Sequence, residues 1–375
     1  MNAPLAGIRI VEVGHMLAGP YCGMMLADLG AEIIKIESPP HGDIGRAVSP
    51  HEVGDHNAYF ASLNRSKKSV MLDLASTEGQ ADLARIVQSS QALITNLRPA
   101  AIRKLGLTYD ALKQHNSALV CVSLTGYGLE GQYSDNPAYD YIIQALTGVM
   151  ALTGDPSAPP TKAGYSAVDN SAGLVAAIGL LAKVVQGQGG QVDVAMYDVM
   201  MSQLNYLAGA VLNANEKMER IPNSSHPYIV PAQVFCTAKG WLALFITHDN
   251  FWKKFCTEIG RPEWVDTPKF ATMAQRRENR EFVVSQIEDI LRTKSAKEWV
   301  QRLQPLGVVT AEIITLSDAL SGDIAASRSL VTPLGDGSLP LRAIASPIKF
   351  TGFTPTYDLP PLLNQHSTEI LGKVG

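Results

Sequence analysis

Short apolar runs alternate with amphipathic segments through the first half of the chain. The runs are rich in β-branched residues, as strands are, and they cover residues 8–13, 33–37, 70–74, 92–95 and 118–124. Segments with a helical pattern, such as residues 77–88, separate these runs, and a further helix is expected from about 136 to 152. Because strands that alternate with helices form βαβ units, the pattern predicts an α/β fold with a parallel sheet in a Rossmann-like large domain.

The composition changes after a polar, proline-containing loop at residues 215–231. Beyond it, residues 234–245 predict a hairpin, and charged helical segments with several aromatic residues follow. This second part reads as a smaller α/β domain. The expected organisation is a large domain over residues 1–215, a small domain over 225–320, and a C-terminal segment, 330–375, that returns to the large domain.

A long apolar helix is expected within residues 164–203, and Asp169 lies where this helix begins. A carboxylate at the N-terminal end of a helix is favoured by the macrodipole and by backbone N–H groups that lack partners within the helix. Position alone leaves two interpretations open. Asp169 is a helix N-cap, worth about 1 kcal/mol, or it is an ionised, partly desolvated nucleophile.

Composition excludes several classes of protein. With 46% hydrophobic and 18% charged residues the 375-residue chain can bury a large core, and its net charge of −4 gives no nucleic-acid footprint. The four cysteines lack a C-x-x-C spacing, which suits reduced thiols. The N-terminus has no basic start, and no apolar run reaches about eighteen residues. We therefore expect a cytoplasmic protein that does not cross a membrane.

Several kinds of active site are disfavoured because their motifs are missing. Gly14 and Gly19 in the first βα turn do not have the spacing of a dinucleotide-binding loop. A G-x-S-x-G elbow and a P-loop are also absent from the sequence. The histidines are scattered, so no metal site is expected. The residues alone indicate an α/β enzyme that handles an anionic ligand, with a first turn that could present backbone amides to a thioester oxygen.

Six blocks of sequence carry a resemblance that extends over nearly the whole chain. They are residues 7–37, 64–69, 96–99, 125–128 and 137–140, and the block Val168-Asp169-Asn170-Ser171-Ala172-Gly173. In this order they resemble the family III CoA-transferases, the group that contains formyl-CoA transferase and carnitine CoA-transferase. The resemblance implies that Asp169 occupies the position of the catalytic aspartate, and that two chains form an interlocked homodimer.

The same resemblance implies a binding site for a CoA thioester, which is a substrate and not a permanently bound cofactor. Its expected residues are His15, Leu17, Ala18, Leu72, Asp73, Leu74, Ala75, Asn96, Leu97, Arg98, Lys104, Tyr139 and Asp140. Cations are needed for the CoA phosphates, because charge-assisted hydrogen bonds hold phosphate strongly. Four candidates for this role are Arg65, Lys67, Arg98 and Lys104.

Departures from the family pattern bear on which reaction is expected. Leu17 stands where formyl-CoA transferases carry a glutamine, and their tetraglycine loop is not seen near Lys239 and Gly240, so formyl-CoA is disfavoured as donor. The related α-methylacyl-CoA racemases need a histidine base where this chain has Tyr139, and tyrosine is a poor base at neutral pH. We expect a CoA-transferase, with a racemase or a non-catalytic CoA-ester-binding protein as alternatives.

The expected mechanism begins with attack of Asp169 on the donor thioester, which gives a mixed anhydride and then an aspartyl-CoA thioester. Backbone N–H groups near Leu17 and Ala18 are expected to hold the oxyanion. Because an apolar Leu17 favours carbon bulk, we expect succinyl-CoA as donor and a four- to six-carbon dicarboxylic acid as acceptor. Candidates to bind the distal carboxylate are His226, Tyr228, His248 and Arg277.

Overall fold

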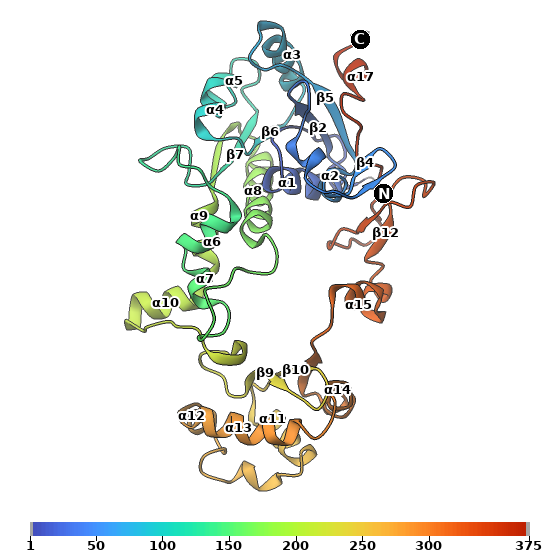
Figure 1. Cartoon of the computed structure of the whole chain (residues 1–375). Helices are drawn as coiled ribbons and strands as arrows, with labels where there is room; N and C mark the ends of the chain where they lie inside the picture. Colours follow the sequence, from blue (N-terminus) through green and yellow to red (C-terminus); the bar gives the residue numbers. More distant parts are fainter. Residues whose placement is uncertain (1–2, 373–375) are drawn as a thin grey trace. The chain divides into compact units, whose positions relative to one another are not determined.

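The computed structural model describes residues 3–372, which form two compact units (Figure 1). The large unit contains the chain up to Thr147, the segment Ala163–Ala214 and the chain from Gly322 onward. The small unit contains Gly148–Lys162 and Asn215–Ser321. The expected range 1–215 for the large domain therefore includes a short stretch, Gly148–Lys162, whose contacts group it with the small unit.

A six-stranded parallel sheet forms the centre of the large unit, which confirms the predicted α/β class. The strands in spatial order are β5 (Lys67–Met71), β2 (Glu32–Glu37), β1 (Arg9–Val13), β6 (Ala92–Thr95), β7 (Val120–Thr125) and β8 (Gly190–Ala195). From β1 the chain first adds β2 and β5 on one side of β1. It then crosses to the other side of β1, where it adds β6, β7 and β8. This change of direction opens a crevice at the carboxyl ends of β1 and β6, where ligands bind in such sheets.

Helices and short hairpins complete the large unit. Its longer helices are α1 (Ala18–Ala27), α2 (Ala58–Asn64), α3 (Thr77–Gln88), α4 (Pro99–Lys104), α6 (Asp140–Leu146), α8 (Ala167–Gln186), α9 (Met196–Gln203) and α10 (Asn205–Ala214). Shorter elements are η1 (Ile44–Ala47), β3 (Glu52–Val53), β4 (His56–Asn57), α5 (Tyr109–Leu112), α16 (Asp323–Ser327), β12 (Val331–Pro333), β13 (Arg342–Ile344) and α17 (Ser367–Leu371).

Two predicted elements differ from the structure for local physical reasons. The strand predicted at 70–74 begins three residues earlier, because the polar Lys67 and Ser69 are buried on the sheet. The helix expected to run from about 136 to 152 is interrupted, because Gly148 takes a left-handed conformation, with φ of 84°. The interruption divides it into α6 and α7 (Val149–Leu152), of which α7 belongs to the small unit.

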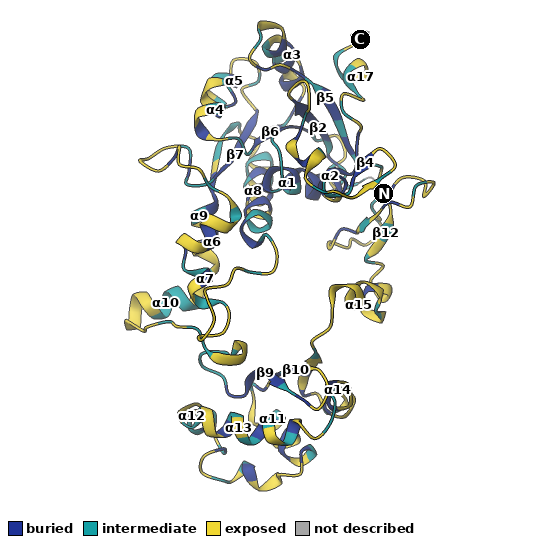
Figure 2. Ribbon diagram, viewed as in Figure 1, coloured by how far each residue is buried: buried dark blue, intermediate teal, exposed yellow. Residues whose placement is uncertain are grey.

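Helix α8 begins after Ser166 and ends at Gly187, whose φ of 70° is the left-handed conformation that glycine readily adopts. It packs against α1 and β7. By length and composition α8 is the single helix among the described residues that could span a membrane, and 33% of its apolar window is buried within the chain. Its buried residues follow one face of the helix, and its exposed apolar residues, such as Leu174 and Ile178, follow the opposite face (burial is coloured in Figure 2).

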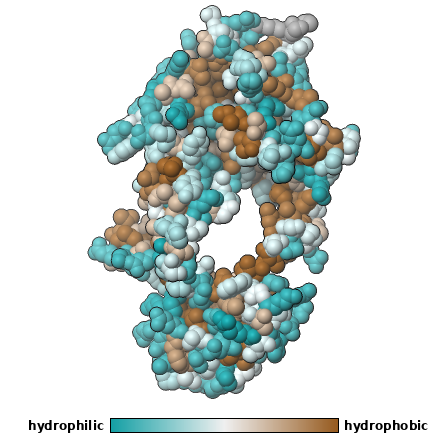
Figure 3. Space-filling model, viewed as in Figure 1, coloured by the Kyte–Doolittle hydropathy of each residue, from teal (hydrophilic) through white to brown (hydrophobic). Residues whose placement is uncertain are grey.

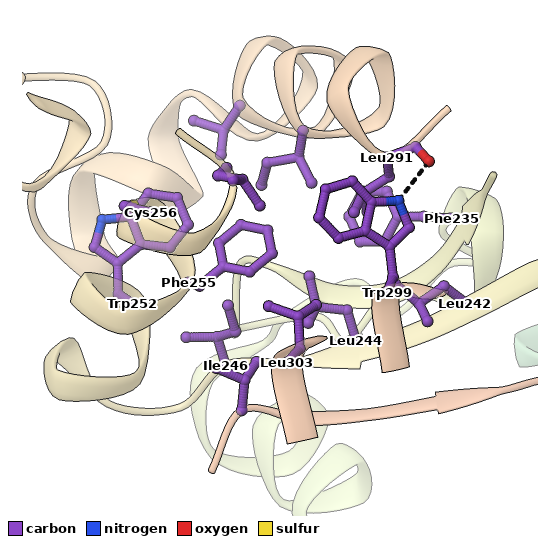
Figure 4. Packing of buried hydrophobic residues seen from close by; sticks show 14 of the residues in the cluster. Phe235, Leu242, Leu244, Ile246, Trp252, Phe255, Cys256, Leu291, Trp299 and Leu303 are labelled. Carbon is purple, nitrogen blue, oxygen red and sulfur yellow. Dashed lines mark hydrogen bonds between the residues drawn. The ribbon is translucent and has the colours of Figure 1, made fainter. Parts of the chain in front are cut away.

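The small unit is built on a three-stranded antiparallel sheet in the order β11 (Val309–Glu312), β10 (Trp241–Phe245), β9 (Ala232–Cys236), and the predicted hairpin is present as β9 and β10. Its other elements are α11 (Asp249–Glu258), α12 (Met273–Glu278), α13 (Arg280–Leu291), α14 (Ala296–Leu303), α15 (Leu316–Ser321) and η2 to η4 (Pro222–Ser224, Pro262–Val265, Gln304–Leu306). Aromatic side chains fill the core, where Trp299 Nε1 donates a hydrogen bond of 2.8 Å to the Leu291 carbonyl (Figure 4).

The close packing of α1 and α8 depends on Gly173. A Cβ atom at this position would lie 2.8 Å from the Ala18 carbonyl oxygen and 3.3 Å from the Cys22 nitrogen. We predict that Gly173→Ala lowers the free energy of unfolding of the large unit by about 1–3 kcal/mol, the typical result of overpacking. Urea unfolding measures this effect.

A matched control is Gly209→Ala in α10, where an added Cβ meets nothing within 4 Å. This change should stabilise α10 by up to about 1 kcal/mol, because alanine has the higher helix propensity. Equal effects of the two substitutions would show that α1 and α8 tolerate a wider separation.

Candidate active site

A cavity of about 350 Å³ lies in the large unit at the carboxyl ends of the parallel strands. The β1–α1 turn, the β6–α4 turn, the end of β7 and the start of α8 all contribute to its wall. Of the residues expected at the CoA site, the cavity brings together His15, Leu17, Ala18, Asn96, Leu97, Arg98, Tyr139 and Asp169. Residues that are distant in sequence therefore meet at the crevice that the strand order creates.

Asn96 holds the β1–α1 turn in place. The His15 backbone N–H donates to Asn96 Oδ1 at 3.0 Å, and Asn96 Nδ2 donates to the His15 carbonyl at 2.9 Å. Cβ atoms at Gly14 and Gly19 would lie 2.2 and 2.9 Å from Asn96 Oδ1. The two glycines that do not fit a dinucleotide loop thus have a different purpose, which is to let Asn96 approach the turn.

Beneath this turn lies a buried cluster of charged groups that sequence reasoning did not identify. Lys35 Nζ lies 2.8 Å from Glu12 Oε1 and from Asp43 Oδ2, and it donates to the Gly14 carbonyl at 3.0 Å. Lys67 Nζ contacts the other Glu12 oxygen at 2.8 Å. Burial alone would raise the pKa of Glu12, but the two lysines hold it below its ordinary value. The feature of the sequence that could have indicated this cluster is Glu12, an acidic residue inside an apolar strand.

Asp43 connects the charged cluster to the turn. Its Oδ1 accepts a hydrogen bond of 3.0 Å from the backbone N–H of Met16, which has a positive φ of 65°. A non-glycine residue in this conformation needs support from its surroundings. The cluster therefore fixes the position of the amides at the start of α1, which line the cavity at Leu17 and Ala18.

Asp169 lies in the first turn of α8, three positions after the N-cap residue Ser166, so it is not the cap itself. Burial, and secondly the charge of Asp140, raise the pKa of Asp169 to about 7. Tyr59 lines the same cavity, and burial together with the charges of Asp169 and Asp43 raises its pKa to about 12. The cavity thus contains a carboxylate that changes its charge near neutral pH.

Two of the predicted phosphate-binding cations were wrong. Arg65 is buried and donates two hydrogen bonds to Asp28, from Nε at 2.9 Å and from Nη2 at 2.6 Å. Lys67 is buried in the charged cluster against Glu12. Both side chains are occupied inside the fold, because sequence spacing shows a cation but not the acid that folding brings to it. Arg98 lines the cavity and is exposed, so its predicted role stands as a prediction.

Other predicted residues lie away from the cavity wall. Leu72 and Leu74 are buried in the hydrophobic core beside the sheet, and the Asp73 carboxylate accepts the backbone N–H of Ala75 at 3.0 Å. Lys104 is exposed at the end of α4. The Asp140 carboxylate accepts hydrogen bonds from the backbone of α8.

The four residues expected to bind a distal carboxylate lie in the small unit. Among them, His226 already accepts backbone N–H groups of Tyr228 and Ile229 at its Nδ1. No group of three or more metal-ligating side chains is found in residues 3–372.

Comparison with known proteins identifies the family. The sequence model described as CoA-transferase family III matches residues 5–367, and the chain belongs to this family. It is 31% identical to an acetyl-CoA:oxalate CoA-transferase of Acetobacter aceti, over 96% of this chain and 92% of that protein. It is also 31% identical to a succinate–glutarate CoA-transferase of Agrobacterium fabrum, over 99% and 96%.

A solved structure supports the same assignment. A CaiB/BaiF family protein of Brucella suis superposes with a TM-score of 0.87 at 30% identity, over 99% of both chains. The fold expected from the resemblance is therefore confirmed at the level of the single chain. As a member of this family, the protein is a CoA-transferase that uses a CoA thioester as substrate.

The charged cluster should be essential for stability. We predict that Glu12→Gln lowers the free energy of unfolding by about 3–5 kcal/mol, because it leaves two buried ammonium groups with one fewer counter-charge. The control is Glu32→Gln, whose partners Arg9 and Lys68 lie at a partly exposed edge. Glu32→Gln should lower the free energy of unfolding by about 1 kcal/mol or less. Similar urea midpoints for both variants would contradict the structural role of Glu12.

Proposed function

We propose that this CoA-transferase moves CoA from a donor such as succinyl-CoA to a dicarboxylic acid, with Asp169 as the nucleophile. The observation that carries the proposal is the position of Asp169, which is partly buried in the wall of the same cavity that Leu17 and Ala18 line at the start of α1. A carboxylate that is desolvated but able to ionise near neutral pH meets the requirement for a nucleophile. The helix-capping interpretation loses its support, since Ser166 occupies the cap position.

The mechanism starts with attack of an Asp169 carboxylate oxygen on the carbonyl carbon of the donor thioester. The C–S bond breaks, which gives an acyl–aspartyl anhydride and CoA thiolate. The thiolate then attacks the aspartyl carbonyl, which releases the donor acid and leaves an aspartyl-CoA thioester. The acceptor carboxylate repeats both steps in reverse, so that the acceptor leaves as its CoA ester and the Asp169 carboxylate is restored.

Each tetrahedral intermediate carries an oxyanion that needs hydrogen-bond donors. The first backbone N–H groups of a helix have no partner within the helix and carry the positive end of its dipole. Leu17 and Ala18 lie at the start of α1 and line the cavity. We propose that these amides stabilise the oxyanion, and that Asn96 and Asp43 hold them in place.

The choice of a dicarboxylic acceptor is supported by two observations. Apolar side chains form part of the cavity wall, among them Met16, Leu17, Ile44 and Met196, and they favour a substrate with carbon bulk. The two relatives described above are named for transfer to oxalate and between succinate and glutarate, which are all dicarboxylic acids.

The alternatives make different chemical demands. A racemase needs groups that remove and return a proton at the α-carbon, and Tyr139, at the position of the racemase histidine, has a side chain that is 64% exposed. A protein that only binds CoA esters would have no need of a carboxylate with a pKa near 7 in its cavity. Both alternatives are therefore less well supported than transfer.

A homodimer is also proposed. Helix α10 is apolar, yet none of its residues is buried within the chain, and Val211 and Leu212 are exposed. Other exposed apolar residues of the large unit include Ile142 of α6 and Ile178 of α8. Apolar atoms reach the surface in the region of α6, α9 and α10 (Figure 3). A surface of this kind marks an interface, and the second copy expected from the resemblance would cover it. The interlocked arrangement and the cytoplasmic location remain predictions.

The role of Asp169 can be tested directly. We predict that Asp169→Asn lowers the rate of CoA transfer by at least about a thousandfold, as removal of a catalytic nucleophile does. The free energy of unfolding, measured with urea, should change by less than about 1 kcal/mol. With donor alone, the wild-type peptide that contains Asp169 should carry covalently bound CoA by mass spectrometry. The control is Asp198→Asn, another acid in the first turn of a helix. A variant at position 169 that kept a few per cent of turnover would remove the nucleophile role.

The acceptor can be found with a panel of acids. We predict that succinyl-CoA gives new CoA esters with dicarboxylic acids of four to six carbons. It should give none with formate, because the apolar wall selects for carbon bulk, and none with carnitine, which has no second carboxylate. Mass spectrometry of the products measures this. A 2-methylacyl-CoA in deuterated water should gain no deuterium at the α-carbon. Rapid exchange would favour the racemase, and acceptance of only small or monocarboxylic acids would refute the dicarboxylate assignment while leaving Asp169 chemistry intact.

A further inference from the structure

The first turn of α8 is held by residues of another helix. We propose that Asp140 and Gln144 of α6 are positioning residues that fix the backbone at Asp169 and make its carboxylate a stronger base. This inference rests on the proposed nucleophile role of Asp169. It assigns to Asp140 a purpose other than the CoA contact expected from the sequence.

Asp140 supplies the cap that α8 does not provide for itself. Its Oδ2 accepts backbone hydrogen bonds from Val168 N at 2.8 Å and from Asp169 N at 3.2 Å. The N-cap residue Ser166 makes no side-chain cap hydrogen bond. The backbone N–H of the nucleophile is therefore tied to a carboxylate of a different helix, which fixes the position of Asp169 relative to α6.

Gln144 fixes Asp140 in turn. The Gln144 side chain is fully buried, its Nε2 donates to Asp140 Oδ1 at 2.5 Å, and its Oε1 accepts the Ala163 backbone N–H at 2.8 Å. One side chain thus connects the segment before α8 to the carboxylate that caps α8. A buried amide whose donor and acceptor are both used is costly to disturb, so this connection is rigid.

The arrangement also determines the charge environment of Asp169. Backbone N–H groups at a helix start usually stabilise a nearby carboxylate, but those of Val168 and Asp169 are occupied by Asp140. Burial, with the charge of Asp140 as a second cause, raises the pKa of Asp169 to about 7. Among ionised groups of the same chemical type, the group with the higher pKa is the stronger nucleophile, as is known for thiolates.

Other ionisable groups also face Asp169 across the cavity. Tyr59 of α2 has a pKa raised to about 12, so it is uncharged near neutral pH. Burial lowers the pKa of His15 in the β1–α1 turn, which leaves this imidazole neutral as well. Arg98 in the β6–α4 turn is the cation of the cavity wall. Asp140 is therefore the group whose charge opposes ionisation of Asp169.

The test is the dependence of kcat/KM on pH for Asp140→Asn. A nucleophile must be ionised, so activity falls as the pH drops through the pKa of Asp169, near 7 in the free enzyme. The substituted amide side chain is neutral, so the acidic limb should move to lower pH by roughly half a unit to one unit. The value of kcat/KM at high pH should also fall, because asparagine has an NH2 donor in place of one of the two carboxylate oxygens, and these accept separately from Gln144 and from the α8 backbone.

Two further variants separate charge from position. Asp140→Ala removes the cap as well, and it should lower kcat by about a hundredfold, the size expected for a small misplacement of a reacting group. Gln144→Met keeps the charge of Asp140 but removes the hydrogen bond that holds the Asp140 side chain. It should lower kcat with little change in the KM for the donor. The control for net charge is Asp110→Asn, at a residue whose side chain is 84% exposed, which should move neither quantity.

The outcomes distinguish this inference from the proposed function. If Asp169→Asn is inactive but Asp140→Asn keeps the acidic limb at the wild-type pH, the inference is overturned and the nucleophile stands. If Asp169→Asn remains active, the proposed function itself fails. Should Asp140→Asn not fold, Gln144→Met decides, since an unchanged kcat and an unchanged pH profile in that variant would also overturn the inference.

Discussion

The buried ion pair between Lys35 and Glu12 is the interaction on which the site depends. These groups lie on the neighbouring strands β2 and β1, and Asp43 joins them directly below the β1–α1 turn. Buried charges are costly unless each has partners, so the turn can have few conformations that keep all of them paired. The sheet thereby imposes one geometry on the amides of Leu17 and Ala18, without any contact between those residues and the charges.

The second constraint is the distance between two helices. Gly173 allows α8 to approach the start of α1, since any side chain there would meet the Ala18 carbonyl. The proposed nucleophile and the proposed oxyanion donors are thus brought to one cavity by backbone packing rather than by long side chains. A short side chain such as aspartate has few rotamers, so a position fixed by the backbone is well suited to a group that must attack one carbon atom.

The sequence was sufficient to predict the elements whose patterns are local. The parallel strands, the β9–β10 hairpin and the helix that starts near Asp169 follow from apolar periodicity, and the resemblance pointed to eight residues of the cavity wall. Partners across the fold could not be predicted. Arg65 and Lys67 look like free cations in sequence, because nothing local shows that Asp28 and Glu12 lie against them. Gln144 lacked any signal, since a single glutamine in a helix is ordinary.

A site with two acids raises the question of how it accepts an anionic substrate. The Asp140 carboxylate accepts hydrogen bonds from two backbone N–H groups and from Gln144, which offset part of its charge, while the rest still opposes ionisation of Asp169. In the proposed mechanism, Asp169 loses its own charge when it forms the aspartyl-CoA thioester, the intermediate that the acceptor carboxylate must approach. Repulsion between Asp169 and the acceptor carboxylate is therefore lowest when the acceptor binds. The negative charge returns to Asp169 when the acceptor leaves as its CoA ester, and this charge favours separation of the product from Asp169.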